Sequence, residues 1–179
     1  MCDGGSTSIG GAPTANGGSG TGYTYAWTPT TGLNDATVSN PTASPATTTT
    51  YTVIVTDSNN CTAEDQVTVT VNPNPTAAAG NDATFCAGAS ATIGGAPTAF
   101  GGSGSGYTYA WTPTTGLDNA TLANPTASPA STTTYTVVVT ESNKCTSEDQ
   151  VTITVKPNPI ADAGADASVC PGGSTGVGG

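Results

Sequence analysis

The sequence repeats itself with a period of 84 residues, and this period restricts the possible folds more than any other feature. Comparison of residues 2–85 with residues 86–169 gives 22 differences, so 62 of 84 positions are identical. A fixed period of this kind indicates a tandem array in which each repeat is one structural unit. The segment after Cys170 begins a further copy.

Two junctions rich in proline lie between the units, at residues 71–82 and 155–166. Proline fixes φ and favours an extended backbone, so we expect each junction to be a semi-rigid spacer. The junctions predict three divisions of the chain: a first β-sandwich repeat lacking its N-terminal strand over residues 1–73, a complete second repeat over 74–157, and the beginning of a third repeat over 158–179.

Short segments of alternating polarity, separated by turn residues, make up the second copy. They are ATFC (83–86), SATIGG (90–95), YTYAWTP (107–113), TLANP (121–125), TTTYTVVVT (132–140) and QVTITVKP (150–157). β-Branched residues dominate these runs, and none has the period of a helix. The predicted fold class is therefore all-β, with tandem immunoglobulin-like β-sandwich repeats of 84 residues.

The final hairpin of a unit shows by its alternation which side chains are buried. One face is predicted to carry Tyr51, Val53, Val55, Val67, Val69 and Val71. The opposite face is rich in threonine and includes Ile54 or Val138. We interpret it as a solvated face, with lateral association between arrays as the alternative.

Three aromatic residues occupy alternate positions in YTYAWTPTTGL, at Tyr23, Tyr25 and Trp27, and the same stretch returns at residues 107–117. Alternate residues of a strand share one face, and a sandwich of this type has a central tryptophan. The predicted structural core is Trp27, Trp111, Tyr51 and Tyr135. The alternative is a carbohydrate-binding module in which Tyr23, Tyr25 and Trp27 stack on sugar rings.

The five cysteines predict disulfides and hence an oxidising, extracellular location. Pairing within each unit is expected, as Cys2–Cys61 and Cys86–Cys145, because closing such a loop would stabilise a small unit by about 4 kcal/mol. A bridge between neighbours, Cys2–Cys145, is the alternative if the two cysteines of a unit lie at opposite poles. Cys170 belongs to the third copy.

Acidic residues recur around the turn of the final hairpin. They are Asp57, Glu64 and Asp65 in the first copy, and Glu141, Glu148 and Asp149 in the second. Three oxygen donors near one turn are weak candidates for Ca²⁺, but a solvated turn is the preferred interpretation. The sequence contains no histidine and no CxxC pair, so neither a zinc site, a cofactor nor catalysis is expected.

The charge balance limits the class of partner. Lys144 and Lys156 are the only cations, the net charge is -10, and no apolar run approaches the ~18 residues of a membrane span. With so few cations the chain has nothing to neutralise a row of phosphates. We therefore expect neither nucleic-acid binding nor membrane insertion.

Four motifs occur in order along the chain: PTAAAGNDATFCAGASATIGG, YTYAWTPTTGL, NPTASP and TTTYTVIVTDSNNCTAEDQVTVTVNP. Together they resemble the PKD-like and immunoglobulin-like repeats of large Bacteroidota surface proteins, such as gliding-motility adhesins and other type IX secretion cargo. The usual PKD strand continues as YxWxFGDG, whereas Trp27 and Trp111 are followed by TPTTGL. No property of the Gly-Asp-Gly turn is therefore transferred to this chain.

Together with the repeat, the resemblance implies a non-enzymatic structural repeat of an extracellular stalk, filament or adhesin on the cell surface, acting as a semi-rigid spacer. The expected partners are further copies of the repeat in the parent chain, laterally associated arrays, and surface polysaccharide or other cells at a tip. The alternative is a carbohydrate-binding or spacer module of a secreted multidomain enzyme.

Overall fold

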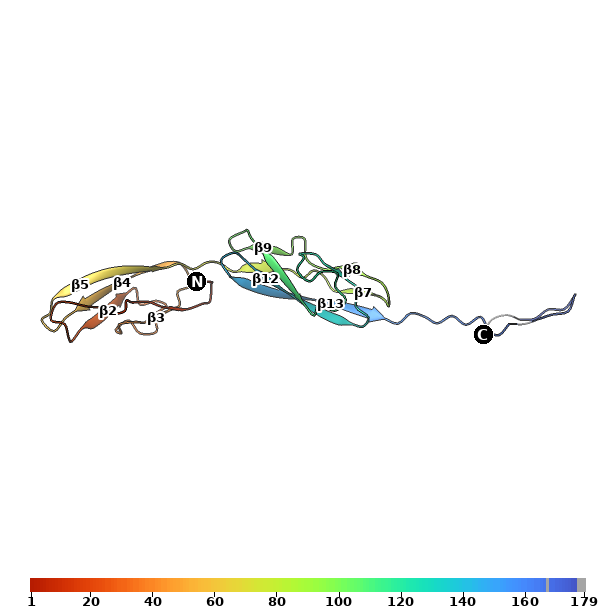
Figure 1. Cartoon of the computed structure of the whole chain (residues 1–179), viewed down its shortest axis with the longest axis horizontal. Coiled ribbons are helices and arrows are strands. Elements are labelled where there is room, and N and C mark those ends of the chain that lie inside the picture. Colours follow the sequence, from red (N-terminus) through yellow and green to blue (C-terminus); the bar gives the residue numbers. More distant parts are fainter. Residues whose placement is uncertain (167, 177–179) are drawn as a thin grey trace.

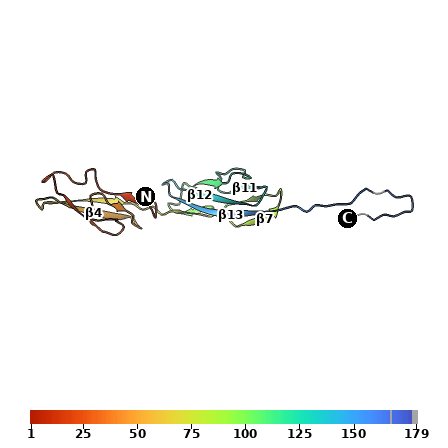
Figure 2. The same cartoon turned by 90° about the horizontal axis from the view of Figure 1, so that it is seen from below.

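The computed structural model describes residues 1–166 and 168–176, and these residues form thirteen strands and no helix. Figure 1 shows two β-sandwiches placed end to end, followed by an extended C-terminal segment, and Figure 2 shows the same line from below. Strands β1 to β5 build the first sandwich, and β6 to β13 build the second. The prediction of an all-β fold is confirmed.

The second sandwich has two layers. One sheet has the order β10-β12-β13-β7, with bounds Thr108–Thr112, Thr133–Thr140, Thr146–Lys156 and Ala83–Cys86. Its strands are antiparallel except for β7, which runs parallel to β13. The other layer pairs β6 (Pro75–Ala77) with β9 (Ala99–Gly101), and β8 (Ala91–Thr92) with β11 (Thr126–Ala127). Two packed sheets of this kind form an immunoglobulin-like sandwich.

The first sandwich repeats this plan with fewer strands. Its main sheet has the order β2-β4-β5, with bounds Thr24–Thr28, Thr49–Thr56 and Thr62–Val69. Opposite lie β1 (Thr7–Ser8) and β3 (Thr42–Ala43). Within the described residues, no further strand pairs with the outer edge of β5. Just beyond its end, Cys2 and Asn72 form an isolated parallel bridge. Among the described residues, this sandwich forms no strand equivalent to β6, β7 or β9.

The core of each sandwich is centred on one tryptophan and one tyrosine. Trp27 is 3% exposed and Trp111 is 1% exposed, while Tyr51 and Tyr135 are fully buried. Trp111 lies opposite Val137 across β10 and β12, and Trp27 lies opposite Val53 in the same register. Both tyrosine hydroxyls donate to backbone carbonyls, Tyr51 to Thr31 at 2.8 Å and Tyr135 to Thr115 at 2.9 Å. The buried hydroxyl groups of both tyrosines therefore have hydrogen-bond partners.

The first junction is shorter than its proline content predicts. Pro75–Ala77 form β6, which pairs with β9, and Ala79 is fully buried in the second core. The join is thus confined to residues 70–74, between the end of β5 and the start of β6. The expectation that residues 71–82 are all spacer is wrong, because their small alanine side chains pack into the second sandwich.

Candidate functional site: an inter-sandwich disulfide and an open groove

One disulfide joins the two sandwiches. Cys2 is bonded to Cys145, with their Cα atoms 5.4 Å apart. Cys145 immediately precedes β13 and is fully buried, and its Sγ lies 4.0 Å from the carbonyl of Asn72 in the join. The bond therefore holds the two sandwiches together where they meet, beside the join.

The expected pairs Cys2–Cys61 and Cys86–Cys145 are corrected by this bond. Cys86 is aligned with Lys156 at the far end of β13, whereas Cys145 stands at its near end. The strand between them spans roughly 33 Å at the usual rise per residue, far beyond the ~6 Å of a disulfide. Cys61, Cys86 and Cys170 are free and exposed.

The same contacts recur at the two ends of the second sandwich. At the near end the Asn74 amide donates to the carbonyl of Asp3 at 3.2 Å. At the far end the Asn158 amide donates to the carbonyl of Ala87 at 3.1 Å. Each residue of the second pair lies one period after its counterpart. The asparagine after each sandwich therefore makes the same backbone contact in both copies.

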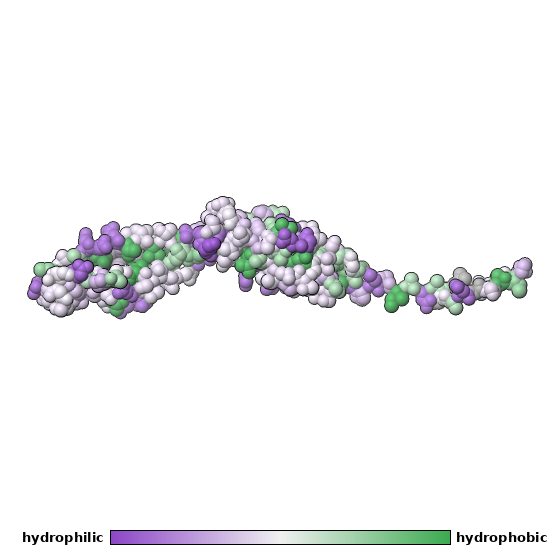
Figure 3. Space-filling model, viewed as in Figure 1, coloured by the Kyte–Doolittle hydropathy of each residue, from purple (hydrophilic) through white to green (hydrophobic). Residues whose placement is uncertain are grey.

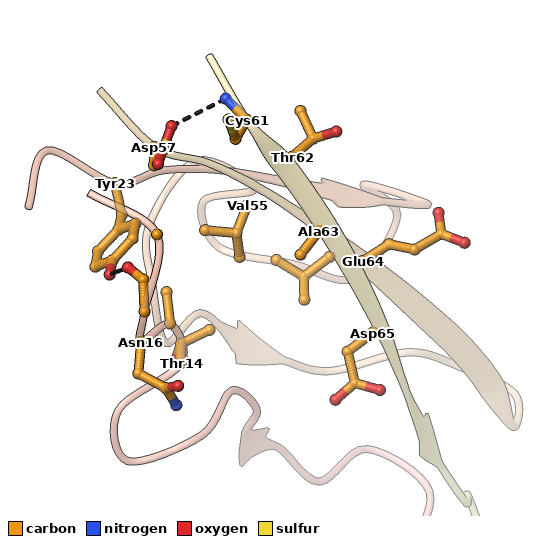
Figure 4. A pocket seen from close by; sticks show the side chains of 14 residues that line it. Thr14, Asn16, Tyr23, Val55, Asp57, Cys61, Thr62, Ala63, Glu64 and Asp65 are labelled. Carbon is orange, nitrogen blue, oxygen red and sulfur yellow. Dashed lines mark hydrogen bonds between the residues drawn. The ribbon is translucent and has the colours of Figure 1, made fainter. Parts of the chain in front are cut away.

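An open groove runs along the first sandwich where the second has β6 and β7. Three pockets share lining residues there: the first two share Thr14, Asn16, Val53 and Asp65, and the last two share Gly10 and Val67. The first pocket has a volume of about 330 Å³. Figure 4 shows its hydrophobic wall beside Val55, with Thr14 and Asn16 on the opposite side.

The missing strands leave hydrophobic core residues partly uncovered. Val139 is fully buried and Val151 is 1% exposed, whereas their counterparts Val55 and Val67 are only partly buried. Hydrophobic side chains reach the surface of the first sandwich in Figure 3. The lining of this groove comes from residues far apart in the sequence, so it becomes visible only in three dimensions.

Two buried carboxylates organise the loops beside the final hairpin. Asp57 is 8% exposed and accepts hydrogen bonds of 2.9 Å from the backbone amides of Ser19, Asn59 and Cys61. These bonds, led by that from Ser19, hold the pKa of Asp57 below its ordinary value. Glu141 is 2% exposed and accepts from the amide of Ser103 at 2.7 Å. Both carboxylates therefore bind loop amides.

The other Ca²⁺ candidates point away from a common centre. Val53 and Ile54 pair with Asp65 and Glu64, so these two acids lie on opposite faces of β5. The Asp149 carboxylate accepts from the amide of Ala79 at 2.8 Å, and Glu148 is exposed. Over residues 1–166 and 168–176, no three His, Cys, Asp or Glu side chains gather into a potential metal site. The carboxylates do not assemble the Ca²⁺ site considered from the sequence.

The aromatic stretch does not form an exposed platform. Trp27 is inside the core, and its Nε1 donates to the carbonyl of Val38 at 3.0 Å. Tyr23 and Tyr25 are only half-buried, and the Tyr23 hydroxyl donates to the carbonyl of Gly17. Without the indole, the three rings cannot stack together on a sugar. The sugar-platform alternative is therefore wrong for this stretch.

The fold and junction define a tandem array of immunoglobulin-like β-sandwiches. No family model matches the sequence, and no curated protein matches it significantly. No helix in the described part of the chain is long and apolar enough to cross a membrane.

Several solved structures are similar to this chain at low identity. DIP-gamma IG1+IG2 is 11% identical over 87% of this chain and 91% of that chain, with a TM-score of 0.37. The insect immune protein hemolin is 12% identical over 88% of this chain and 44% of that chain, with a TM-score of 0.38. Sidekick-1 immunoglobulin domains 1–4 are 12% identical over 91% of this chain and 51% of that chain, with a TM-score of 0.34. We base the fold assignment on the strand pairing described above, and draw no function from these similarities.

Proposed function

We propose that this chain is a non-enzymatic structural repeat of an extracellular stalk, filament or adhesin on a bacterial surface, where it acts as a semi-rigid spacer. The observation that carries this proposal is the Cys2–Cys145 disulfide, which joins successive sandwiches instead of closing either one on itself. A covalent bond beside a short join limits bending between units. An array that gains reach by adding identical units requires this stiffness.

The proposed division of the chain into repeats rests on contacts that recur after one period. We propose a first repeat over residues 1–73, a second over 74–157 and the beginning of a third over 158–179. The repeated contacts of Asn74 and Asn158 support placing each boundary just before these residues.

The location follows from the chemistry of the junction. Disulfides persist in oxidising compartments, so a bond that holds the units in line supports an extracellular site. The net charge of -10 favours solubility and mutual repulsion at a surface. The resemblance to Bacteroidota surface repeats supports the same location. The proposed partners are further copies of the repeat, with surface polysaccharide or other cells contacted by a tip domain.

Electron microscopy of the native assembly tests the surface role. Cells labelled with an antibody raised against this chain should show long fibres with an axial repeat of one sandwich. Globular heads on short labelled stalks would instead identify a spacer in an adhesin or a secreted multidomain enzyme. Label confined to the cell interior would overturn the proposal.

Small-angle scattering of the purified chain tests the stiffness. The oxidised chain should give a narrow distribution of maximum dimension, as expected for the line of sandwiches in Figure 1. Cys2→Ser should broaden that distribution, because only residues 70–74 would then join the units. Cys61→Ser is the matched control, since Cys61 is free. Equal flexibility of Cys2→Ser and the parent chain would refute the stiffening role of the disulfide.

A further inference from the structure

A surface turn of the second sandwich contains the sequence Asn119-Ala120-Thr121, which has the form of an N-glycosylation motif. We propose that Asn119 is the acceptor of an N-linked glycan, transferred from a lipid-linked oligosaccharide diphosphate after the chain leaves the cytoplasm. This inference goes beyond the proposed spacer role, and it rests on the proposed extracellular location.

The sequence excludes most asparagines as acceptors. N-glycosylation requires Asn-x-Ser or Asn-x-Thr in which x is not proline. A proline occupies the middle position between asparagine and threonine at Asn40, Asn74 and Asn124. The motif is complete in two places, at residues 60–62 and 119–121. The structure distinguishes between these two.

Thr121 holds the side chain of Asn119 by its oxygen. The amide and the hydroxyl of Thr121 donate to Asn119 Oδ1 at 2.9 and 2.8 Å. In the part of the chain that the structure describes, Asn119 Nδ2 donates no hydrogen bond, whereas the side-chain nitrogens of Asn40 and Asn124 donate to backbone carbonyls at 3.0 Å. Donation to Oδ1 draws electron density from the amide and makes its N–H protons easier to remove. The atom that would receive the sugar is therefore available and activated.

The first sandwich forms the same turn with a carboxylate. Asp35 lies one period before Asn119, and the amide and hydroxyl of Thr37 donate to Asp35 Oδ1 at 2.8 and 2.7 Å. An aspartate supplies the oxygen that the turn needs but has no amide nitrogen to glycosylate. The turn therefore folds without the nitrogen, so Asn119 Nδ2 can be modified without loss of a structural contact.

The turn stands on the surface beside an outer strand. Asn119 and Thr121 are both exposed. The backbone amide of Trp111 donates to the carbonyl of Ala120 at 2.9 Å, which holds the turn against β10, the outermost strand of its sheet. A sugar on Asn119 would extend into solvent beside this sheet, and no core contact has to break to admit it.

The other complete motif is arranged differently. The backbone of Asn60 has a φ of +63°, and its amide donates to the carbonyl of Asp57 at 3.0 Å. Thr62 is the first residue of β5 and pairs with Thr56. Over residues 1–166 and 168–176, no hydrogen bond joins Thr62 to the side chain of Asn60. We therefore assign the acceptor to Asn119 and expect Asn60 to stay unmodified.

The transfer is a substitution at the anomeric carbon of the donor. Asn119 Nδ2 forms a bond to this carbon and loses one proton to a base of the transferring enzyme. The bond between the carbon and the diphosphate oxygen breaks, and the lipid diphosphate leaves with the electron pair. One N–C bond thus replaces one C–O bond, and nothing is oxidised or reduced.

Mass spectrometry of the protein purified from the cells that make it tests the site. Chymotrypsin cleaves after Trp111 and Tyr135, and the peptide of residues 112–135 should carry the added mass of an oligosaccharide. The equivalent peptide of the first copy, residues 28–51, contains Asp35 and should have the mass of its sequence. The two peptides provide a matched comparison within one chain.

Substitutions at the motif test its chemistry. Asn119→Asp and Thr121→Ala should each remove the added mass completely, whereas Thr121→Ser should retain it because serine also supplies a hydroxyl. Asn119→Asp should fold normally, since Asp35 forms the same turn in the first sandwich. Any loss of the glycan in that variant therefore cannot be attributed to misfolding.

A gain of modification is the converse test. Asp35→Asn completes the motif in the first sandwich, where Thr37 already donates to the side-chain oxygen. This variant should carry a second glycan, on the peptide of residues 28–51. Asn60→Gln is the control and should leave the glycan on the peptide of residues 112–135 unchanged.

An unmodified peptide of residues 112–135, in protein recovered from the cell surface, would overturn the glycan and leave the spacer role and its location standing. Added mass that persists in Thr121→Ala, or a glycan on Asn60 instead of Asn119, would also refute the assignment. Recovery of the protein from the cell interior alone would overturn the proposed location and, with it, this inference.

Discussion

The Nε1 of Trp111 donates a hydrogen bond of 3.0 Å to the carbonyl of Leu122. Trp111 is the largest fully buried side chain, so its replacement leaves both a cavity and an unpaired carbonyl. We expect Trp111→Phe to destabilise the second sandwich by about 2 kcal/mol, measured by calorimetry. Ala110→Ser, at an exposed neighbouring position, is the control and should change stability little. Equal melting of Trp111→Phe and the parent would contradict this account of the core.

The open groove predicts that one substitution has unequal effects in the two sandwiches. Val139 is fully buried, whereas Val55 is partly uncovered at the groove. Val139→Ala should cost about 2 kcal/mol and Val55→Ala about 1 kcal/mol, because less apolar surface is removed from water at Val55. Hydrogen exchange of β12 and β4 would follow the two sandwiches separately. Equal losses in the two sandwiches would show that the groove is closed.

The carboxylate of Asp57 makes the first sandwich sensitive to acid. Hydrogen bonds from Ser19 and Cys61 lower its pKa in the folded state. Its contribution to stability is therefore present above the unfolded pKa of about 3.9 and is lost as the pH falls through the lower folded pKa. Asp57→Asn should flatten the acid limb of a stability–pH curve measured by urea unfolding. The exposed Glu64→Gln is the control, and identical curves for Asp57→Asn and the parent would oppose this role.

The disulfide predicts a specific pair of linked peptides. Trypsin cleaves after Lys144, and chymotrypsin separates Cys2, Cys61 and Cys86 at the intervening aromatic residues. Under non-reducing conditions, the peptide that begins at Cys145 should be joined to the one that contains Cys2. Recovery of the Cys145 peptide joined to Cys61 or Cys86 would contradict the junction.

Local alternation predicts the faces of the strands well. The alternation places Tyr51 and Val53 inside and Ile54 outside, and Ile54 is 40% exposed. Such a prediction needs only the two-residue period of a strand and one buried face. The expected strand near residues 121–125 is instead β11 at Thr126–Ala127, because turns displace short edge strands easily.

The disulfide pairing, which joins residues far apart in the sequence, could not be predicted from this alternation. The choice between Cys61 and Cys145 as the partner of Cys2 depends on which pole of a sandwich each cysteine occupies. That placement follows from the parallel pairing of β7 with β13, which sets Cys86 beside Lys156. Likewise, the alanines after Pro75 look like a linker in sequence, and only their burial in the second core identifies them as a strand.

The disulfide also determines how the chain responds to pulling. A force applied between the N-terminal end and the C-terminal segment passes through Cys2, across the sulfur bridge to Cys145, and directly along β13. The 143-residue loop between the cysteines is outside this path. The contour length of this loop is ~480 Å at ~3.4 Å per residue. The loop cannot be extended by the force while the bond is intact. Reduction would release that hidden length, so the redox state of a single bond sets how far the molecule can stretch before it fails.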